Sequence, residues 1–308
     1  MAASAPGKVI LFGEHAVVFG EPALATAIHL RTEVYVRPHS TWRADGSSLD
    51  DPKYRYVRAA LHRGWNGSPL WVEVRSMIPP GSGLGSSAAV TVATLGAAFD
   101  LREAFDVPQI AREAFEVEHE VQGRASPIDT TTSAAGGGVL VRRGDGTDLL
   151  WSLRKDTREW SLHRCDLPAL TLVVGDTGIA AATGPLVAGV KRRVDASREA
   201  AQRVREIGEI ALEGLRALQR HDLEGAGRLM DRNQHLLTEL GVGHPMLDKL
   251  IGAARPSSYG AKLTGAGGGG SMVALTDRPE ETAEAIRAVG GKAFSVRSEP
   301  SGVRRLRS

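Results

Sequence analysis

Several features that define large classes of proteins are scarce or missing in this chain of 308 residues. Cys165 is the only cysteine, so we expect no intrachain disulfide and no cysteine-based metal cluster. The 38 basic and 36 acidic side chains nearly cancel to a net charge of +2, which gives no electrostatic basis for binding nucleic acid or anionic membranes. No run of about 18 apolar residues is present, and Lys8 interrupts the N-terminal apolar run. We therefore expect a cytoplasmic protein without a signal peptide or membrane span.

The composition that remains is that of a folded, mixed protein. Apolar residues make up 42% of the chain and charged residues 24%, and the length suits one large domain or two ordinary ones. Strand and helix patterns follow one another without a steady alternation, which predicts an α+β fold rather than a doubly wound parallel sheet. We place a domain boundary between residues 166 and 167, which divides the chain into 1–166 and 167–308.

Hydrophobic periodicity and turn residues predict the secondary structure. The expected strands are 9–12, 30–36, 71–74, 139–141, 170–174, 261–263, 272–275 and 293–296. The expected helices are 88–99, 108–122, 185–219, 223–240, 246–254 and 279–289. The polar stretch 142–165 is predicted to be a hairpin or loop region at the surface.

The strongest chemical signal is a glycine-rich loop between a predicted strand and a predicted helix. It contains Pro80, Gly81, Ser82, Gly83, Leu84, Gly85, Ser86 and Ser87. Alternating glycines let the backbone approach a ligand closely, and the free N–H groups and dipole of the following helix attract anions. The loop is neither a Walker A motif nor a dinucleotide fingerprint, because both the Lys-Ser/Thr pair and the G-x-G-x-x-G spacing are missing. We interpret it as a phosphate-binding loop, with a plain helix-capping turn as the alternative.

A second glycine-rich segment runs from Lys262 to Gly270 and contains four consecutive glycines. Such a run is entropically costly in a folded protein, so a constraint of space is expected to retain it. A nucleotide or the first glycine-rich loop lying against this segment would supply that constraint. A flexible hairpin tip is the alternative.

Three polar residues flank the first predicted strand. Lys8 lies just before the buried part of the strand and is either an edge residue or an active-site cation. Glu14 and His15 follow the strand after a glycine, where they suit hydrogen bonding to a small substrate. A histidine taken alone is more often structural.

Two carboxylates in the first half also stand out. Glu118 lies on the apolar face of the helix predicted over 108–122, where a carboxylate needs a cation or a metal ion unless it sits at the edge of the face. Asp129 lies among hydroxyl residues, where a turn or cap is the commoner role. Together with the loops, these residues would form a kinase site, in which Glu118 and a loop serine hold Mg²⁺, Asp129 receives or orients the acceptor proton, and Lys8 offsets developing charge.

Three segments together resemble the galactokinase, homoserine kinase, mevalonate kinase and phosphomevalonate kinase (GHMP) family. They are Pro6 to His15, Pro79 to Ala89 and Lys262 to Gly270, which occur in the family's order and near its usual positions. Within the family, residues 5–18 and 178–190 are most similar to the mevalonate kinase branch, in its compact archaeal form. The resemblance extends over nearly the whole chain.

The resemblance implies a fold and a set of roles. The N-terminal domain would resemble ribosomal protein S5 domain 2, the C-terminal domain would be ferredoxin-like, and ATP would bind between them. Ser87 and Glu118 would be Mg²⁺ ligands, Asp129 the catalytic base, and Lys8 its neighbour beside the reacting oxygen. The residues near the acceptor mevalonate would be Glu14, His15 and Thr183. The loop of residues 80–87 would wrap the phosphates, supported by Gly265 and Gly267, and a homodimer is expected.

Two departures from the family pattern leave some features open. Residues 125–129 read Ala-Ser-Pro-Ile-Asp where many eukaryotic members have Pro-Ser-Gly-x-Asp, and Ala181 falls where such members often carry arginine. Acceptor contacts and feedback control by isoprenoid diphosphates are therefore open. The alternatives are a family kinase for another small alcohol and a nucleotide-binding protein without catalysis.

Overall fold

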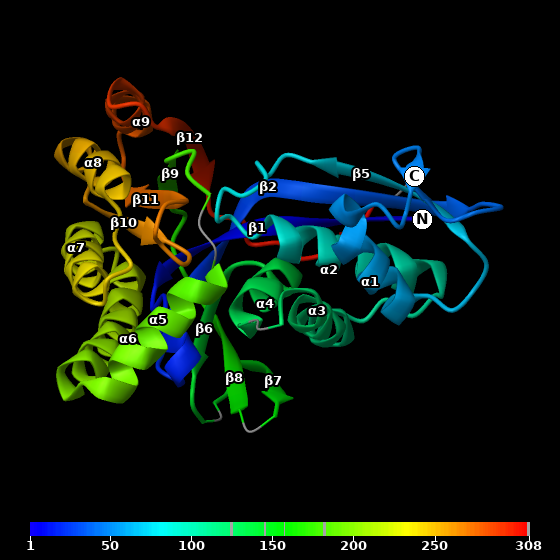
Figure 1. Ribbon diagram of the computed structural model, residues 1–308, viewed down its shortest axis with the longest axis horizontal. Helices are drawn as coiled ribbons and strands as arrows, with labels where there is room; N and C mark the ends of the chain where they lie inside the picture. The colour runs from blue at the N-terminus through cyan, green and yellow to red at the C-terminus, as the bar shows by residue number, and fades with distance from the viewer. Residues whose placement is uncertain (124–125, 145, 157, 181–182, 307–308) are drawn as a thin grey trace.

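The computed structural model describes residues 1–123, 126–144, 146–156, 158–180 and 183–306. Ala125 and Ala181, where the sequence departs from the family pattern, lie outside these ranges. Each half of the chain contains one β-sheet with helices packed against it (Figure 1). The architecture is α+β, as the succession of patterns predicts.

The first half is built on a large sheet, which has nine strands within the described ranges. Its central path runs β4-β3-β5-β2-β6-β8-β7, while β1 pairs with both β2 and β13. Helices α1 to α4 lie along one side of this sheet, with α2 packed against β1 and β2 (Figure 1). The strands are β1 Ala2–Phe12, β2 Ala23–Pro38, β3 Arg43–Ala44, β4 Ser47–Ser48, β5 Leu70–Ser76, β6 Gly138–Arg142, β7 Leu149–Lys155, β8 Arg158–Cys165 and β13 Arg304–Arg305. The helices are α1 Arg55–Gly64, α2 Ser86–Leu101, α3 Val107–Gln122 and α4 Pro127–Ala135, with 3₁₀ turns η1 Ala16–Phe19 and η2 Pro52–Tyr54.

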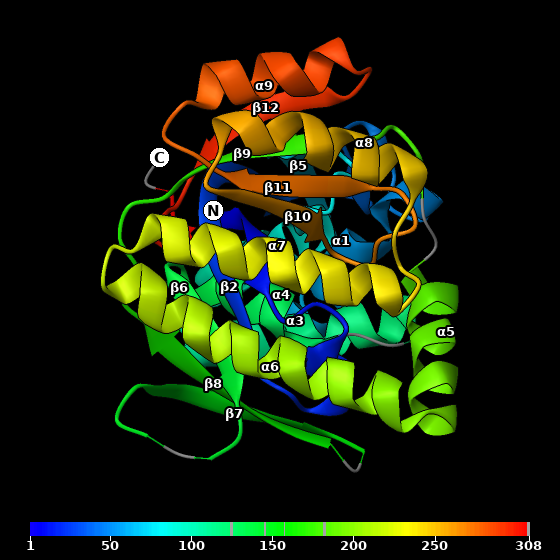
Figure 2. The same cartoon turned by 90° about the vertical axis from the view of Figure 1, so that its left-hand side faces the viewer.

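The second half carries a four-stranded antiparallel sheet with the order β10-β11-β9-β12. Along the chain, β9 leads through helices to β10 and β11, and α9 leads to β12, which is the ferredoxin-like topology. Figure 2 shows α6 to α9 covering the outer side of this half. The strands are β9 Thr171–Asp176, β10 Gly260–Thr264, β11 Ser271–Leu275 and β12 Lys292–Arg297. The helices are α5 Thr183–Ala196, α6 Arg198–Gln219, α7 Leu223–Glu239, α8 Pro245–Ala254 and α9 Pro279–Ala288, with the 3₁₀ turn η3 Arg255–Ser257.

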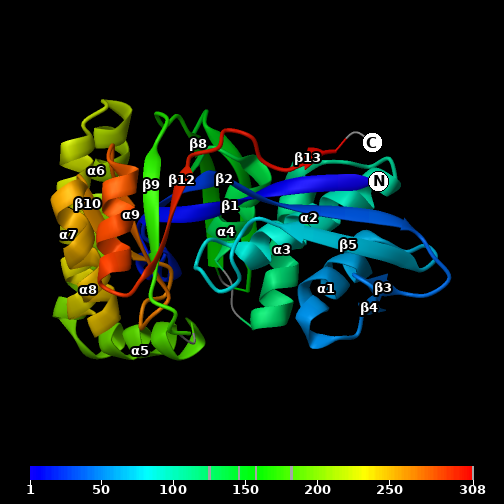
Figure 3. The ribbon, with the colours of Figure 1, turned by 90° about the horizontal axis from the view of Figure 1, so that it is seen from above.

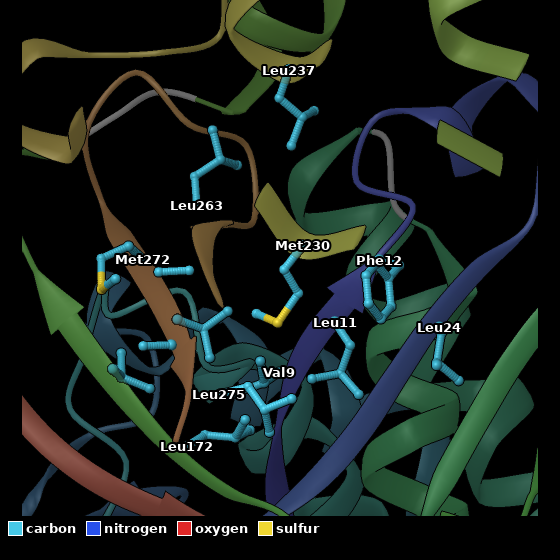
Figure 4. Close-up of a cluster of buried hydrophobic side chains, with 14 of the residues drawn as sticks. Val9, Leu11, Phe12, Leu24, Leu172, Met230, Leu237, Leu263, Met272 and Leu275 are labelled. Carbon is cyan, nitrogen blue, oxygen red and sulfur yellow. The ribbon is translucent and has the colours of Figure 1, made fainter. Parts of the chain in front are cut away.

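One hydrophobic core joins the two halves. Val9, Leu11 and Phe12 of β1 are buried in the same cluster as Met230 of α7 and Leu263 of β10 (Figure 4). The C-terminal end of β1 is therefore held from both sides. This fixes the turn that follows β1 relative to the second sheet.

The helices differ from the sequence-based expectation in three places. The helix predicted over 185–219 is two helices, α5 and α6, because Ser197 adopts an extended conformation and its hydroxyl caps α6 by accepting from the Ala200 N–H at 3.2 Å. The segment around Asp129 is a helix, α4, and Asp129 lies in its first turn rather than at its cap, which is Ser126. Helix α1 was not expected at all.

The C-terminal segment returns to the first sheet. Figure 3 shows β13 beside β1, with both chain ends at the same end of the molecule. The buried guanidinium of Arg31 donates to the carbonyl oxygens of Ser301 and Gly302, at 3.1 and 2.6 Å. The predicted boundary at 166/167 falls between the end of β8 at Cys165 and the start of β9 at Thr171.

Within the described ranges, none of the helices combines the length and the apolar composition needed to cross a bilayer.

The docking of the C-terminal segment can be tested at Gly136. Its φ is +71°, and a Cβ there would lie 2.2 Å from the backbone nitrogen of Gly302. We expect Gly136→Ala to lower the free energy of unfolding by about 3 kcal/mol, because backbone strain and overpacking add. Gly46→Ala is the matched control, since Gly46 also has a positive φ, of +81°, but nothing lies within 4 Å. Its cost should be about 1 kcal/mol in urea unfolding, and equal losses would contradict the docking.

Candidate active site

The first glycine-rich loop leaves the N-terminus of α2 open. Gly81, Gly83 and Gly85 all have φ between +70° and +73°. Gly85 is the N-cap of α2 and has no side chain to satisfy the first N–H groups of the helix. These groups and the helix dipole are therefore available to an anion.

Two side chains of this loop point inward. Ser82 and Leu84 are both buried, and the Ser82 hydroxyl donates to the Pro79 carbonyl at 2.7 Å. These side chains hold the loop in shape. Any ligand contact at these two predicted positions would thus come from their backbone.

The structure brings Lys8 of β1 next to Asp129 of α4. Lys8 Nζ lies 3.0 Å from Asp129 Oδ1 and also donates to the Gly83 carbonyl at 3.4 Å. The Lys8 side chain is 3% exposed and that of Asp129 is 28% exposed. The ion pair thus joins the loop, β1 and α4 at one point, with the carboxylate still within reach of a ligand.

Close packing around Lys8 explains the glycine at position 85. A Cβ on Gly85 would lie 2.9 Å from Lys8 Cγ. The Lys8 N–H also donates to the Leu84 carbonyl at 2.9 Å, so the lysine holds the loop through its backbone as well. A side chain at position 85 would press on the aliphatic stem of Lys8.

Glu118 of α3 belongs to the same cluster. Its carboxyl is buried, and Asp129, Ser87 and Lys8 all lie close enough to affect its pKa. Burial, followed by the negative charge of Asp129, raises the pKa of Glu118 to about 7, while the Ser87 hydroxyl and the Lys8 charge act in the opposite direction. Gln122 Nε2 donates to Glu118 Oε1 at 3.2 Å. The alternative that Glu118 sits at a half-exposed helix edge is therefore wrong.

Glu14 and His15 face the second glycine-rich loop. Glu14 Oε1 pairs with Nζ of Lys262 in β10, and both side chains are buried. His15 Nε2 lies 2.9 Å from the Ala266 carbonyl oxygen, which can only accept, so this nitrogen carries the proton. Burial lowers the pKa of His15, which favours the neutral ring. Among the described residues, His15 Nδ1 and Glu14 Oε2 have no hydrogen-bond partner.

The ion pair between Lys262 and Glu14 was not predicted from the sequence, where Lys262 stands out only as the first residue of the second glycine-rich segment. A signal was present, because this lysine interrupts the apolar pattern Ala261-Lys262-Leu263 of a predicted strand. Its partner lies 248 positions away in the sequence. No local pattern could have identified that partner.

The second glycine-rich loop is constrained by its surroundings. A Cβ on Gly267 would lie 2.1 Å from the Val242 carbonyl oxygen, and one on Gly269 would lie 2.7 Å from that of Ile179. A Cβ on Gly83 would lie 3.5 Å from the Thr264 carbonyl oxygen, so the two loops are neighbours. The glycine run is therefore constrained by space rather than being a flexible hairpin tip, but the close contacts come from the segments at Val242 and Ile179 and not from the first loop.

The other predicted site residues lie around this loop. Gly265 has a φ of +88° and open space where a Cβ would project. Thr183 is exposed and begins α5, whose Leu186 approaches Gly268. The first turn of α5 therefore lies beside the second loop.

Comparison with known sequences identifies the family. The model of the GHMP kinases N terminal domain matches residues 54–137, and that of the GHMP kinases C terminal matches residues 215–296. A mevalonate kinase of Pyrococcus abyssi is 36% identical, over 98% of this chain and 96% of the relative. The chain belongs to the GHMP kinase family. A second relative, the mevalonate kinase of Methanothermobacter thermautotrophicus, is 37% identical over 89% of both chains.

A solved structure agrees with this assignment. The crystal structure of L. major mevalonate kinase in complex with R-mevalonate superposes with a TM-score of 0.83 and 26% identity, over 97% of this chain and 96% of that one. The two-domain kinase fold expected from the motifs is therefore confirmed. Membership of this family makes the chain an ATP-dependent kinase.

The environment of Glu118 predicts how stability depends on pH. The carboxyl titrates near 7 in the folded protein and near 4.5 in the unfolded chain, so between these values the folded state binds more protons. In metal-free buffer, the free energy of unfolding contributed by Glu118 should fall by roughly 3 kcal/mol as pH rises from 4.5 to above 7.

Urea unfolding of wild type and Glu118→Gln with EDTA, between pH 5 and 8, measures this contribution. The variant should lack that part of the pH dependence. If the free energies of unfolding of the two proteins changed with pH in parallel, the pKa of Glu118 would not be raised in the folded protein.

Proposed function

We propose that the chain is a mevalonate kinase, which transfers the γ-phosphoryl group of ATP to the 5-hydroxyl of (R)-mevalonate. Relatives with that name, 34–37% identical to this chain, support the proposal. The observation that carries it is the Lys8–Asp129 ion pair, which lies directly beside the open N-terminus of α2. A phosphate-binding element and a group able to accept a hydroxyl proton therefore meet at one point.

The residues around Glu118 fit a magnesium ion. A buried carboxyl with a raised pKa lacks the cation that would stabilise its charge, and a hydroxyl lies next to it. Carboxylate and hydroxyl oxygens are hard donors of the kind that Mg²⁺ prefers, together with substrate phosphates. Ser87 and Glu118 would hold the ion, which when bound neutralises charge on the phosphates.

The chain's own residues then position the reactants. The backbone of residues 81–87 holds the phosphates, with Gly265 and Gly267 supporting them from the second loop. Asp129 accepts the proton of the acceptor hydroxyl or orients that hydroxyl, and Lys8 stabilises charge at the reacting oxygen. Phosphoryl transfer needs mainly such positioning and electrostatic stabilisation.

Further assignments are also proposals. Glu14, His15 and Thr183 form the acceptor side of the site, supported by their place around the second loop. The domains divide at residues 166 and 167, supported by the position between β8 of the first sheet and β9 of the second, with only β13 returning to the first sheet. A homodimer is an expectation from the family resemblance alone, and a cytoplasmic location is an expectation from the sequence alone.

The acceptor can be tested directly. ADP release should depend on mevalonate and not on 5-phosphomevalonate, galactose or homoserine, with product phosphorylated at the 5-position in phosphorus NMR. Normal ATP binding without mevalonate-dependent ADP release would reject the proposal. Preference for another acceptor would overturn the assignment of the acceptor side and leave the nucleotide site unchanged.

The role of Asp129 can be tested by Asp129→Asn. The change removes the proton acceptor but no phosphate contact, so turnover should fall by about 10³-fold while the Kd of Mg-ADP stays within about threefold. Glu113→Gln is the control, since Glu113 pairs with Arg63 on the surface and not with the site. It should retain wild-type kinetics, and near wild-type turnover in Asp129→Asn would remove Asp129 from the mechanism.

A further inference from the structure

Lys262, the buried partner of Glu14, has no role in the chemistry described above. The ion pair joins β10 of the second half to the turn after β1 in the first half. Lys262 is completely buried, and its ammonium also donates to the Leu263 carbonyl at 2.7 Å. Glu14 is 1% exposed. Each charge is thus removed from water and depends on the other.

Stability alone gives no reason to keep these charges. Burial lowers the pKa of Lys262 and raises that of Glu14, so desolvation opposes both charged forms. A buried ion pair can often be replaced by apolar residues of similar volume without loss of stability. Removing one partner is costly, because the other is left as an unpaired charge. The pair therefore needs an explanation in what it holds in place.

The pair lies among other contacts that connect the same two segments. The Thr264 hydroxyl donates to the Ile10 carbonyl at 3.3 Å, and the His15 ring donates to the Ala266 carbonyl. Both contacts lie just after Lys262, along the entry to the second glycine-rich loop. That entry also carries the Thr264 carbonyl, which faces Gly83 of the first loop.

Helix α7 braces both segments. Asn233 Oδ1 accepts from the Gly13 N–H at 3.4 Å, and Gln234 Oε1 accepts from the Leu263 N–H at 2.8 Å. Neighbouring residues of one helix thus bind the two chain segments that the ion pair joins. The remaining Glu14 oxygen, Oε2, has no partner among the described residues. Lys262 therefore determines where this free oxygen points.

We propose that Lys262 is a positioning residue, which through Glu14 fixes the second glycine-rich loop against the first and orients the Gly13–His15 turn. The inference rests on the proposed function for the nature of the ligand, a magnesium nucleotide with a small alcohol as acceptor. Lys262 touches neither reactant. Its loss would act by displacing the phosphate-binding backbone and the acceptor side together.

Two variants of the ion pair separate an effect on positioning from an effect on stability. Lys262→Met leaves the Glu14 charge unpaired and should lower the Tm by about 10 °C. Glu14→Gln combined with Lys262→Met removes both charges and should restore the Tm to within about 3 °C of wild type. The double variant should still bind Mg-ADP about tenfold more weakly in calorimetry. Its kcat/KM should be about 100-fold lower, the effect of a displacement of about 1 Å. Because this variant also removes the Glu14 carboxylate from the acceptor side, the Kd of Mg-ADP is the readout that reports positioning.

Thr282→Val is the matched control for a lost buried polar contact. Thr282 is fully buried and bonded to Ser257 and Thr276, in a cluster of α9, η3 and the end of β11 that makes no contact with either loop in the hydrogen bonds of the described chain. It should lower the Tm without changing the Kd of Mg-ADP. A change in that Kd as large as in the double variant would overturn the proposal.

Wild-type kcat/KM and Mg-ADP affinity in the folded double variant would also overturn it, because the pair would then serve stability only. If the double variant does not fold, Glu14→Asp tests the proposal instead. This variant keeps both charges, but its side chain is shorter by one methylene group and reaches less far toward Lys262. It should bind Mg-ADP more weakly than wild type, and unchanged binding would reject the proposal. Failure of wild type to use mevalonate would refute the proposed function, whereas the Mg-ADP comparison would still test Lys262.

Discussion

The structure depends on charges that β1 and the turn after it carry into the interior. Lys8 and Glu14 are both almost inaccessible to water, and each needs an opposite charge that its own neighbourhood does not supply. Asp129 comes from α4 and Lys262 comes from β10, so the two pairs are complete only when both halves of the chain have folded around β1. The apolar side chains of the same strand form the core between the halves (Figure 4). The contacts that hold the two halves together thus also hold the site residues in place.

The glycines follow from this arrangement. A Cβ at Gly7 would lie 2.8 Å from the Leu84 carbonyl oxygen, and one at Gly85 would press on the Lys8 stem. The loop can approach β1 closely only because both positions lack a side chain. The loop carbonyls of Gly83 and Leu84 are then occupied by Lys8, while its N–H groups at the start of α2 stay available. The same lysine therefore shapes the anion site and pairs with the carboxylate beside it.

Local patterns predicted most of the elements and the composition of the site. The burial of Glu118 followed from its place on an apolar helix face, and both loops followed from their glycines. Helix α4 was not expected, because Pro127 to Ser133 is rich in hydroxyl residues, which favour turns and caps, and tertiary packing overrides that preference. The division between α5 and α6 depends on one serine cap. The Lys262–Glu14 pair could not be predicted, since it depends on topology across 248 positions.

The charges of the Lys8, Glu118 and Asp129 cluster bear on the proposed metal site. Lys8 supplies one positive charge to two neighbouring carboxyls, so without a further cation one carboxyl tends to hold a proton, and burial selects Glu118 for this. A carboxylate that holds a metal ion must be ionised, so Glu118 would give up this proton if it held Mg²⁺ as proposed. Near neutral pH the loss of the proton would cost little, because the pKa of Glu118 is already about 7. Asp129, paired with Lys8 and partly exposed, would then be the carboxylate that faces the acceptor hydroxyl. The difference in burial between the two adjacent carboxyls thus supports the proposed division into a metal ligand and a proton acceptor.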